Sequence, residues 1–519
     1  MEKKLTPQIV EIRVLPEQAS KSEVLEKQLC KKLRWESIQK SQYRILKKSL
    51  DARKNPIIFR FRIEVSANGF EEENVTKFPT PGDQSAVIVG FGPAGMFAAL
   101  ELLKNGVKPI VIERGKEVSK RRRDLVSIFR DREVNPDSNY CFGEGGAGTF
   151  SDGKLYTRSK KRGDIQDVLQ TFVDHGAKPE IVYEAHPHIG TNKLPGIVQN
   201  IRESIIKLGG EVRFDTKLTD IILENGKICG AETSNGLIPT NHIILATGHS
   251  ARDIFELLHN RDIAIEAKPF ALGVRIEHPQ DMIDRAQYKC ERGEFLPPAA
   301  YSLVKQVKGR GVFSFCMCPG GIIAPAMTDS NEVVVNGWSP SKRNGEFANS
   351  GFVVEIGPND WKRFGENNPL AAMKFQEKVE GKAFRMGGED LTAPAQRVGD
   401  FLKGKPSPVI QETSYLPGVK SVDLNEVLPG FVHQRIRGAI AAFGKRLKGY
   451  DSNAGVLVGV ESRTSSPVRI PRDRESLEHP DVHGLYPCGE GAGYAGGIMS
   501  AALDGIACAR KIGESISAK

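Results

Sequence analysis

The sequence predicts an α/β protein whose main domain is built on a parallel β-sheet. An apolar, β-branched run breaks into a G-x-G-x-x-G turn over residues 86–95, and a helix-forming stretch follows from Pro93 to Leu103. A second apolar run at 109–112 ends in Glu113, 18 residues after the last glycine of the turn. A strand, a glycine turn, a helix and a second strand in this order form a Rossmann-like unit.

Each residue type in this turn has a physical role in holding a dinucleotide. Gly90 permits a tight turn, Gly92 lets the backbone approach a pyrophosphate, and Gly95 lets helix and strand pack closely. The N-terminus of the helix faces the phosphates, and the acid after the second strand, Glu113, accepts a ribose hydroxyl. A glycine-rich turn without a ligand is the alternative interpretation. The other expected contacts in this segment are Pro93, Ala94 and Arg114.

A second glycine-rich turn near the C-terminus indicates which dinucleotide binds. A short strand ends at Gly489-Glu490, small residues follow, and a helix starts near Gly496, Gly497 and Ile498. A fold that binds only NAD has no use for such a turn. A flavin needs a polar side chain such as Glu490 for its ribityl chain, and backbone N–H groups at a helix start stabilise its ring oxygen. We therefore expect FAD.

A third segment fits between these two turns. A strand at 243–245 leads into a small-residue turn, and the hairpin signals Asn225-Gly226 and Asn235-Gly236 lie between alternating apolar runs before it. A three-stranded meander followed by Ala-Thr-Gly is typical of one large group of FAD proteins. The expected FAD contacts here are Ala246, Thr247 and Gly248.

On these segments the chain resembles the FAD-dependent oxidoreductases of the glutathione-reductase-like superfamily. More closely, it is similar to a bacterial family described as uncharacterised FAD-dependent dehydrogenases. The resemblance implies an oxidoreductase that passes two electrons between a small organic substrate and the flavin. Glu490 stands where an Asp is more usual in the wider superfamily. The segments that carry the closer match are 141–155, 188–194, 314–321 and 461–469.

The predicted domains follow the usual division of such flavoproteins. We expect an N-terminal α+β domain over 1–80, an FAD-binding domain over 82–268 and 455–519, and a substrate domain inserted over 269–454. Apart from the C-terminal turn, which we assign to the flavin, no second G-x-G-x-x-G follows a strand, so NAD(P)H, if it is the electron donor, would reach the flavin through the substrate cleft. The insert is expected to form a mainly antiparallel sheet from strand-like runs at 270–277, 311–317, 332–338 and 351–356.

The first 80 residues form a basic segment. Runs at 9–15 and 57–65 alternate like strands, whereas 22–33 and 41–53 have helical spacing. The segment holds 17 basic and 11 acidic side chains, and so carries +6 of the chain's net charge of +9. Small basic α+β modules can bind RNA. Phenylalanines that alternate with arginines in 57–65 also suit a half-buried strand with its charges in water, so we do not expect nucleic-acid binding.

Composition limits the remaining classes. No stretch approaches the roughly 18 uninterrupted apolar residues of a membrane span, and the start of the chain lacks a signal-peptide apolar region. The eight cysteines are scattered, which argues against a secreted disulfide framework. We therefore expect a cytoplasmic protein that acts on a small molecule and does not bind membranes. The sequence leaves the oligomeric state open.

Three side chains are candidates for chemistry at the flavin. Lys154 and Arg463 could stabilise the reduced anion near flavin N1, and His188 could move protons or hold a substrate carboxylate. Solvated or internally paired side chains are the alternative for all three. No His or Cys has a covalent-attachment signature, so we expect non-covalent FAD. The loop 143–153 is too rich in small and polar residues to be core, and its expected flavin contacts are Gly146, Thr149 and Ser151.

Cys316 and Cys318 lie two residues apart on a predicted strand, so both side chains face the same way. A zinc site needs two further ligands at matching spacing, which the sequence lacks, so no metal is expected. In the disulfide flavoprotein reductases the redox pair lies just after the dinucleotide turn, where this chain has no cysteine. A catalytic dithiol is therefore the second interpretation, and two small buried thiols are favoured.

Three other functions stay open at this point. A flavin monooxygenase would carry an Asp-Gly motif before its final flavin segment, which we do not find. An RNA-modifying flavoprotein would use the basic N-terminal domain. A binding protein could keep FAD for structure alone.

Overall fold

The computed structural model describes residues 7–71, 78–157 and 163–518. Its first sheet contains five parallel strands in the order β22-β10-β4-β5-β6. This order brings the three glycine-rich segments of the sequence to the carboxyl ends of adjacent strands, which confirms the Rossmann-like fold. The strands are β4 (Ser85–Val89), β5 (Lys108–Ile112), β6 (Glu211–Arg213), β10 (Ile243–Leu245) and β22 (Leu485–Pro487).

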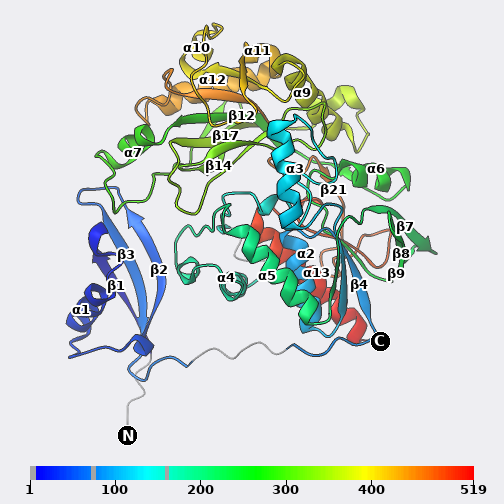
Figure 1. The fold of residues 1–519 in the computed structure, drawn as a ribbon, viewed down its shortest axis with the longest axis horizontal. Helices are drawn as coiled ribbons and strands as arrows, with labels where there is room; N and C mark the ends of the chain where they lie inside the picture. Colours follow the sequence, from blue (N-terminus) through cyan, green and yellow to red (C-terminus); the bar gives the residue numbers. More distant parts are fainter. Residues whose placement is uncertain (1–6, 72–77, 158–162, 519) are drawn as a thin grey trace.

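Helices α2 (Pro93–Lys104), α5 (Leu194–Lys207) and α13 (Ile498–Ser517) pack together beside this sheet (Figure 1). Residues Ala94 to Leu103 of α2 are all buried, because the helix is enclosed by its neighbours. A Cβ at Gly505 would lie 2.1 Å from the Ala94 carbonyl oxygen, so α13 needs glycine there to approach α2 this closely. The other helices of this domain are α3 (Val118–Arg130), α4 (Ile165–Asp174) and α6 (Arg252–Asn260).

The insert forms a seven-stranded sheet in the order β13-β14-β17-β12-β20-β18-β19. All neighbouring strands are antiparallel except β18 and β19, which confirms the mainly antiparallel insert. β20 extends this sheet past the expected domain boundary at residue 454. The strands are β12 (Phe270–Pro279), β13 (Val304–Val307), β14 (Arg310–Cys318), β17 (Phe347–Ile356), β18 (Ala393–Arg397), β19 (Val419–Ser421) and β20 (Val456–Glu461).

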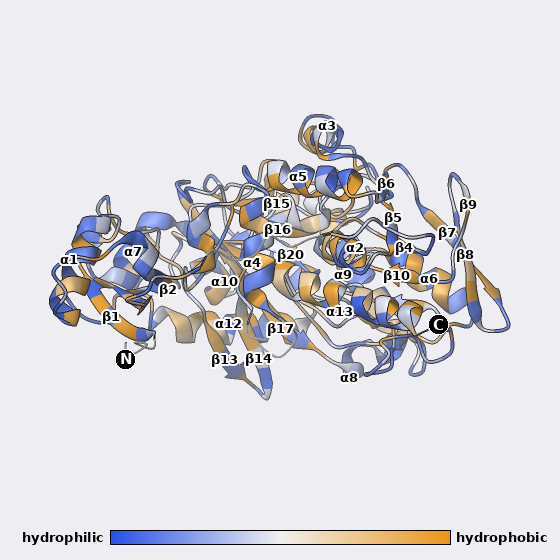
Figure 2. Ribbon diagram, turned by 90° about the horizontal axis from the view of Figure 1, so that it is seen from below, coloured by the Kyte–Doolittle hydropathy of each residue, from blue (hydrophilic) through white to orange (hydrophobic). Residues whose placement is uncertain are grey.

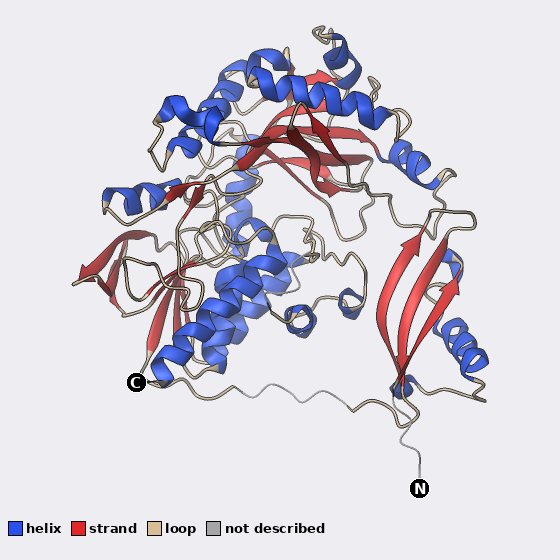
Figure 3. Cartoon of the chain, turned by 180° about the vertical axis from the view of Figure 1, so that it is seen from behind, coloured by secondary structure: helices blue, strands red, loops and turns tan. Residues whose placement is uncertain are grey.

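Helices α9 (Ala371–Gly387) and α12 (Gly430–Gly444) cover the outer face of the seven-stranded sheet (Figure 3). Buried side chains such as Phe352 and Phe443 fill the space between the layers, with their rings edge to face. The opposite face of the sheet is directed toward the parallel sheet. Shorter elements of the insert are α7 (Gln280–Tyr288), α8 (Pro358–Trp361), α10 (Val398–Lys403), α11 (Leu424–Val427), and the strand pair β15 (Ile322–Pro325) and β16 (Val335–Trp338).

Strands β7 (Leu218–Glu224), β8 (Lys227–Thr233) and β9 (Gly236–Pro239) form a separate antiparallel meander. The turn between β7 and β8 has positive φ at Asn225 and Gly226, and Gly236 has φ +104° at the start of β9. Asn and Gly adopt such angles at low cost. The three-stranded meander expected from the hairpin signals is therefore confirmed.

The N-terminal unit is a three-stranded antiparallel sheet, in the order β1-β3-β2, with one helix packed on it. Helix α1 is amphipathic (Figure 2) and buries Leu25 and Leu29 against the sheet. Its bounds match the expected helix at 22–33. The elements are β1 (Gln8–Val14), α1 (Ser22–Leu33), β2 (Tyr43–Asp51) and β3 (Ile58–Val65).

The predicted second helix at 41–53 is wrong, because this segment is strand β2. A β-bulge shifts the register between Ile45 and Lys47. The bulge interrupts the period-two pattern and leaves apolar residues Tyr43, Leu46 and Leu50 at intervals of three and four, as in a helix.

The N-terminal unit contacts the rest of the chain along β2 and just before β3. The backbone of Lys48 bonds to Tyr183 and Ala185, and Ile57 joins the hydrophobic core of the insert. None of the described helices combines the length and the hydrophobicity that a membrane span requires.

Candidate functional site

A pocket lies where the carboxyl ends of β4, β5, β10 and β22 face the insert. It encloses about 1480 Å³ of empty space, open solvent at its mouth included. Four of the predicted site residues do not line this pocket: Gly95, Thr149, Gly496 and His188. Those that line it are Gly90, Gly92, Pro93, Ala94, Glu113, Arg114, Gly146, Ser151, Lys154, Ala246, Thr247, Gly248, Arg463, Gly489, Glu490, Gly497 and Ile498.

The first glycine turn has the geometry that a pyrophosphate site needs. Gly90 has φ +102°, and a Cβ there would lie 2.5 Å from the Ala246 carbonyl oxygen. A Cβ at Gly95 would lie 2.0 Å from the Gly90 carbonyl oxygen. Glycine is therefore required at this position although Gly95 does not line the pocket. Gly92 caps α2 and Pro93 is its first residue, so a helix N-terminus with free N–H groups borders the pocket.

Glu113 holds the walls of this part of the pocket together. Its Oε2 accepts an N–H from Phe91 at 2.9 Å, and its Oε1 accepts N–H groups from Gly115 at 2.9 Å and Gly143 at 3.0 Å. A carboxylate has about four acceptor positions, so one is left for a ligand hydroxyl. The residue is buried and lines the pocket, which is the placement that a ribose contact requires.

We expect Glu113→Ala to lower the FAD occupancy of the purified protein. The substitution removes the expected ribose acceptor and leaves three backbone N–H groups without their partner. Flavin absorbance per chain measures the effect. Unchanged occupancy together with an altered preference between NADH and NADPH would reassign Glu113 to a nicotinamide cofactor.

An unpaired buried hydroxyl marks the same pocket. Thr247 lines it, and its Oγ1 is buried with no hydrogen-bond partner in the described structure. Leaving such a group unpaired costs about 1–3 kcal/mol, and a bound polar ligand removes that cost. The glycine turn, the helix N-terminus, Glu113 and Thr247 together fit the polar part of FAD.

The C-terminal turn forms the neighbouring wall. The Gly497 N–H donates to the Glu490 carboxylate, so the acid lies beside the start of α13. His249 Nε2 is 3.5 Å from Glu490 Oε2, and burial lowers the pKa of this histidine. His249 lines the pocket and was not predicted, although it directly follows the predicted Ala246-Thr247-Gly248 turn.

The loop carrying Gly146 is held by a buried cation. Arg121 of α3 is fully buried and donates to the carbonyl oxygens of Asn139 (2.8 Å), Glu144 (2.8 Å) and Gly146 (2.9 Å). A Cβ at Gly148 would lie 3.5 Å from Ile498, so the loop packs on the start of α13. The sequence gives no signal for Arg121, because its partners are backbone atoms.

Lys154 reaches from this loop to the insert. Its ammonium donates to the Met317 carbonyl oxygen and lies 3.7 Å from Cys316 Sγ, 3.9 Å from Cys318 Sγ and 3.8 Å from Asp152 Oδ2. Burial opposes its charge, but its interactions with Cys316, Cys318 and Asp152 raise the pKa of Lys154. The side chain therefore remains protonated at the pocket wall.

His188 has a structural position. Its backbone pairs with Lys154 in an isolated β-bridge, and its Nε2 is 3.1 Å from the Ser341 carbonyl oxygen. Arg343 pairs with Asp152 at 2.5 Å.

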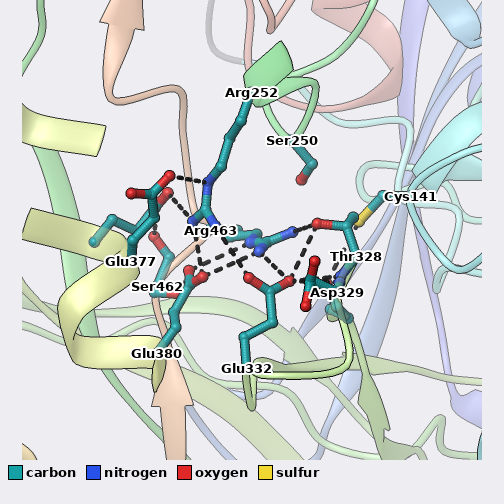
Figure 4. Close-up of polar contacts among 12 residues, drawn as sticks. Cys141, Ser250, Arg252, Thr328, Asp329, Glu332, Glu377, Glu380, Ser462 and Arg463 are labelled. Atoms are coloured by element: carbon teal, nitrogen blue, oxygen red, sulfur yellow. Dashed lines mark hydrogen bonds and ion pairs between the residues drawn. The ribbon is translucent and has the colours of Figure 1, made fainter. Parts of the chain in front are cut away.

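Arg463 lines the pocket but is paired with acids of the insert (Figure 4). Its guanidinium lies 2.5 Å from Glu332 and 3.0 Å from Glu380, and donates to Thr328 at 2.8 Å. Arg252 pairs with the same two acids, at 3.0 and 2.7 Å. The four charges form a largely buried cluster that joins α6, α9, the loop before β16 and the 461–469 segment.

Arg275 and Glu461 form a second buried pair. Their closest atoms are 2.9 Å apart, and neither side chain is more than 2% exposed. Arg275 therefore does not lie on a solvated surface and is not free to bind an anion. Within the 461–469 segment, Glu461 pairs with Arg275, whereas Arg463 pairs with Glu332 and Glu380.

A parallel sheet with this turn, acid and helix start defines a dinucleotide-binding flavoprotein fold, and comparisons agree. Residues 84–260 match the family described as pyridine nucleotide-disulphide oxidoreductase, and residues 269–464 match FAD-dependent protein, C-terminal domain-like. Residues 6–66 match a domain of unknown function. A Clostridium beijerinckii protein, described as uncharacterized, is 43% identical over 513 residues, which cover 94% of this chain and 95% of that protein.

The chain belongs to the same family as this Clostridium beijerinckii protein, and it is an FAD-dependent oxidoreductase. Two solved structures show more distant similarity. A geranylgeranyl bacteriochlorophyll reductase-like protein from Thermoplasma acidophilum is 13% identical, with a TM-score of 0.36 over 84% of this chain and 79% of that one. L-proline dehydrogenase from P. horikoshii is 13% identical, with a TM-score of 0.33 over 84% and 94% of the two chains.

Proposed function

We propose that the protein passes two electrons between a small organic substrate and FAD held non-covalently in the pocket. The observation that carries this proposal is the shared lining of the pocket. Phe315 and Cys316 of β14 and Asn336 beside them come from the insert, whereas the glycine turns come from the parallel sheet. A substrate bound between the two domains would be adjacent to the cofactor and shielded from water by the insert.

Bound flavin supplies two-electron transfer, and the protein supplies orientation and charge. Lys154 is the side chain we assign to the stabilisation of negative charge on the cofactor, because it lines the pocket and its pKa is raised. Arg463 is less suited to this role than the sequence indicated. Its charge is already compensated by Glu332 and Glu380, so we assign it to holding the insert in place.

Anaerobic reduction of the flavin tests the proposed reaction. The purified holoenzyme is mixed without oxygen with NADH, with NADPH and with single members of a metabolite panel, while the absorbance of oxidised flavin is recorded. We expect one of these donors to bleach the flavin. A flavin that NADH or NADPH reduces only when an aromatic compound is bound, and that hydroxylates this compound once oxygen is admitted, would contradict the proposal in favour of a monooxygenase.

We expect the N-terminal unit to contribute no RNA affinity at physiological salt. Three of its six arginines are paired with acids: Arg44 with Glu64 at 2.7 Å, Arg60 with Glu11 at 3.2 Å, and Arg53 with Asp51. Phosphate-driven binding needs free cations and falls steeply with salt.

Binding of total cellular RNA is measured for the full chain and for a chain that begins at Asp83, at low and physiological salt. Tight binding at physiological salt that disappears in the shortened chain would support an RNA-modifying flavoprotein instead.

A further inference from the structure

Two cysteines of the insert, Cys316 and Cys318, lie close to the side chains of Lys154 and Arg275 at the pocket wall. Cys316 lines the pocket, whereas Cys318 is buried behind it. The Lys154 ammonium contacts both sulfur atoms, at 3.7 and 3.9 Å, so the two thiols share one cationic partner. Arg275 Nη2 lies 3.5 Å from Cys318 Sγ and donates to the Cys316 carbonyl oxygen at 2.7 Å.

The backbone departs from a regular strand at this point. The pairing of β14 with β17 shifts register between Phe315 and Cys318, and Cys316 has φ +45°. Cys316 therefore does not follow the simple alternation of β14. The departure lets one thiol reach the pocket while the other stays in the interior, although both interact with Lys154.

The surroundings distinguish these thiols from ordinary buried cysteines. A nearby cation stabilises the thiolate, which is the reactive form of cysteine, whereas an apolar environment keeps the thiol protonated and inert. Interaction with Cys318, together with Lys154 and Arg275, holds the pKa of Cys316 well below its usual range although burial opposes this. Interaction with Cys316 and burial raise the pKa of Cys318. The pair thus holds one thiolate at the pocket and one thiol behind it.

We propose that Cys316 and Cys318 form a reversible disulfide that exchanges two electrons with FAD. The proposal rests on the proposed function, because FAD must occupy the pocket. In the oxidative direction, the Cys316 thiolate and the Cys318 thiol form an S–S bond. Two electrons and the Cys318 proton pass to oxidised FAD, which becomes the reduced anion FADH⁻. The reverse step breaks the S–S bond with the same two electrons and proton.

Photoreduction of the full-length holoenzyme tests this exchange. The protein is oxidised with one equivalent of diamide, freed of the reagent and made anaerobic, and its FAD is then photoreduced with EDTA and light. Denaturation in iodoacetamide and mass analysis report the two thiols before and after illumination. Trypsin releases both cysteines on one peptide, residues 311–342, which contains no other cysteine.

We expect the diamide-treated peptide to carry an internal disulfide and to become doubly alkylated after illumination. Flavin bleaching should lag until two further electrons per FAD have been accepted. Cys316→Ser and Cys318→Ser should remove the lag, and Cys290→Ser, at an exposed cysteine, should keep it. The wild-type peptide analysis does not depend on the folding of either variant.

Two results would overturn the dithiol proposal alone. Both cysteines could remain open to alkylation after diamide, or the disulfide could survive complete bleaching of the flavin. A preparation without any flavin absorbance would instead overturn the cofactor assignment on which the proposal rests.

Discussion

Replacing Arg463 with methionine is expected to lower the free energy of unfolding by about 3–5 kcal/mol. The substitution keeps most of the side-chain volume but removes one of the two cations that neutralise Glu332 and Glu380. Arg463 is 6% exposed and Glu380 is fully buried, so water cannot replace the lost partner. A charge left unpaired in the interior costs far more than an exposed ion pair contributes.

Arg285→Met is the matched control, because Arg285 pairs with Asp281 on the surface, where the two side chains are 51% and 62% exposed. We expect the control to change the stability by about 0.5 kcal/mol or less. The two variants and the wild type are compared by denaturant unfolding at pH 7. If Arg463→Met lowered the free energy of unfolding no more than the control does, the buried cluster would not contribute the stability that we assign to it.

The same cluster predicts a pH dependence. Burial alone would raise the pKa of Glu380, but Arg252 and Arg463 lower it well below its ordinary value of 4.5. A carboxyl with a depressed pKa in the folded state stabilises the protein above that ordinary value and loses this contribution as the pH falls. The stability difference between wild type and Arg463→Met should therefore shrink below about pH 4.5.

Gly95→Ala is expected to abolish most FAD binding. The added Cβ would lie 2.0 Å from the Gly90 carbonyl oxygen, a backbone atom that cannot move without displacing the glycine turn. Because that turn positions α2 against the pyrophosphate, its displacement removes the phosphate contacts. Flavin content per chain after purification gives the readout.

Gly196→Ala provides a matched control. Gly196 is the third residue of α5, as Gly95 is of α2, but a Cβ there would have no neighbour within 4 Å. Alanine should keep the FAD content and raise stability by roughly 0.5–1 kcal/mol, since glycine is a poor helix former. Equal flavin content in both variants would contradict the role assigned to Gly95.

Local patterns in the sequence predicted the FAD-binding part of the fold. The turn from Gly90 to Gly95, the acid Glu113 and the three-stranded meander all depend on residues close together in the chain, and each has a required residue type. Strand β2 was missed for a local reason, because its bulge imitates helical spacing.

The remaining features depend on partners far apart in the chain. Arg463 meets Glu332 and Glu380, more than 80 residues earlier, and Lys154 meets Cys316, 162 residues later. A single sequence does not indicate which of these side chains contact each other. Lys154 and Arg463 were both proposed as charges near the flavin, and only their partners distinguish the two.

The most direct test of this account is the flavin content of the purified protein. Acid precipitation of the yellow, full-length protein should release one FAD per chain into the supernatant, as identified by chromatography against FAD and FMN standards. Flavin that stays with the precipitate would contradict non-covalent binding. A colourless protein that takes up no FAD when the cofactor is added would contradict the assignment of the pocket itself.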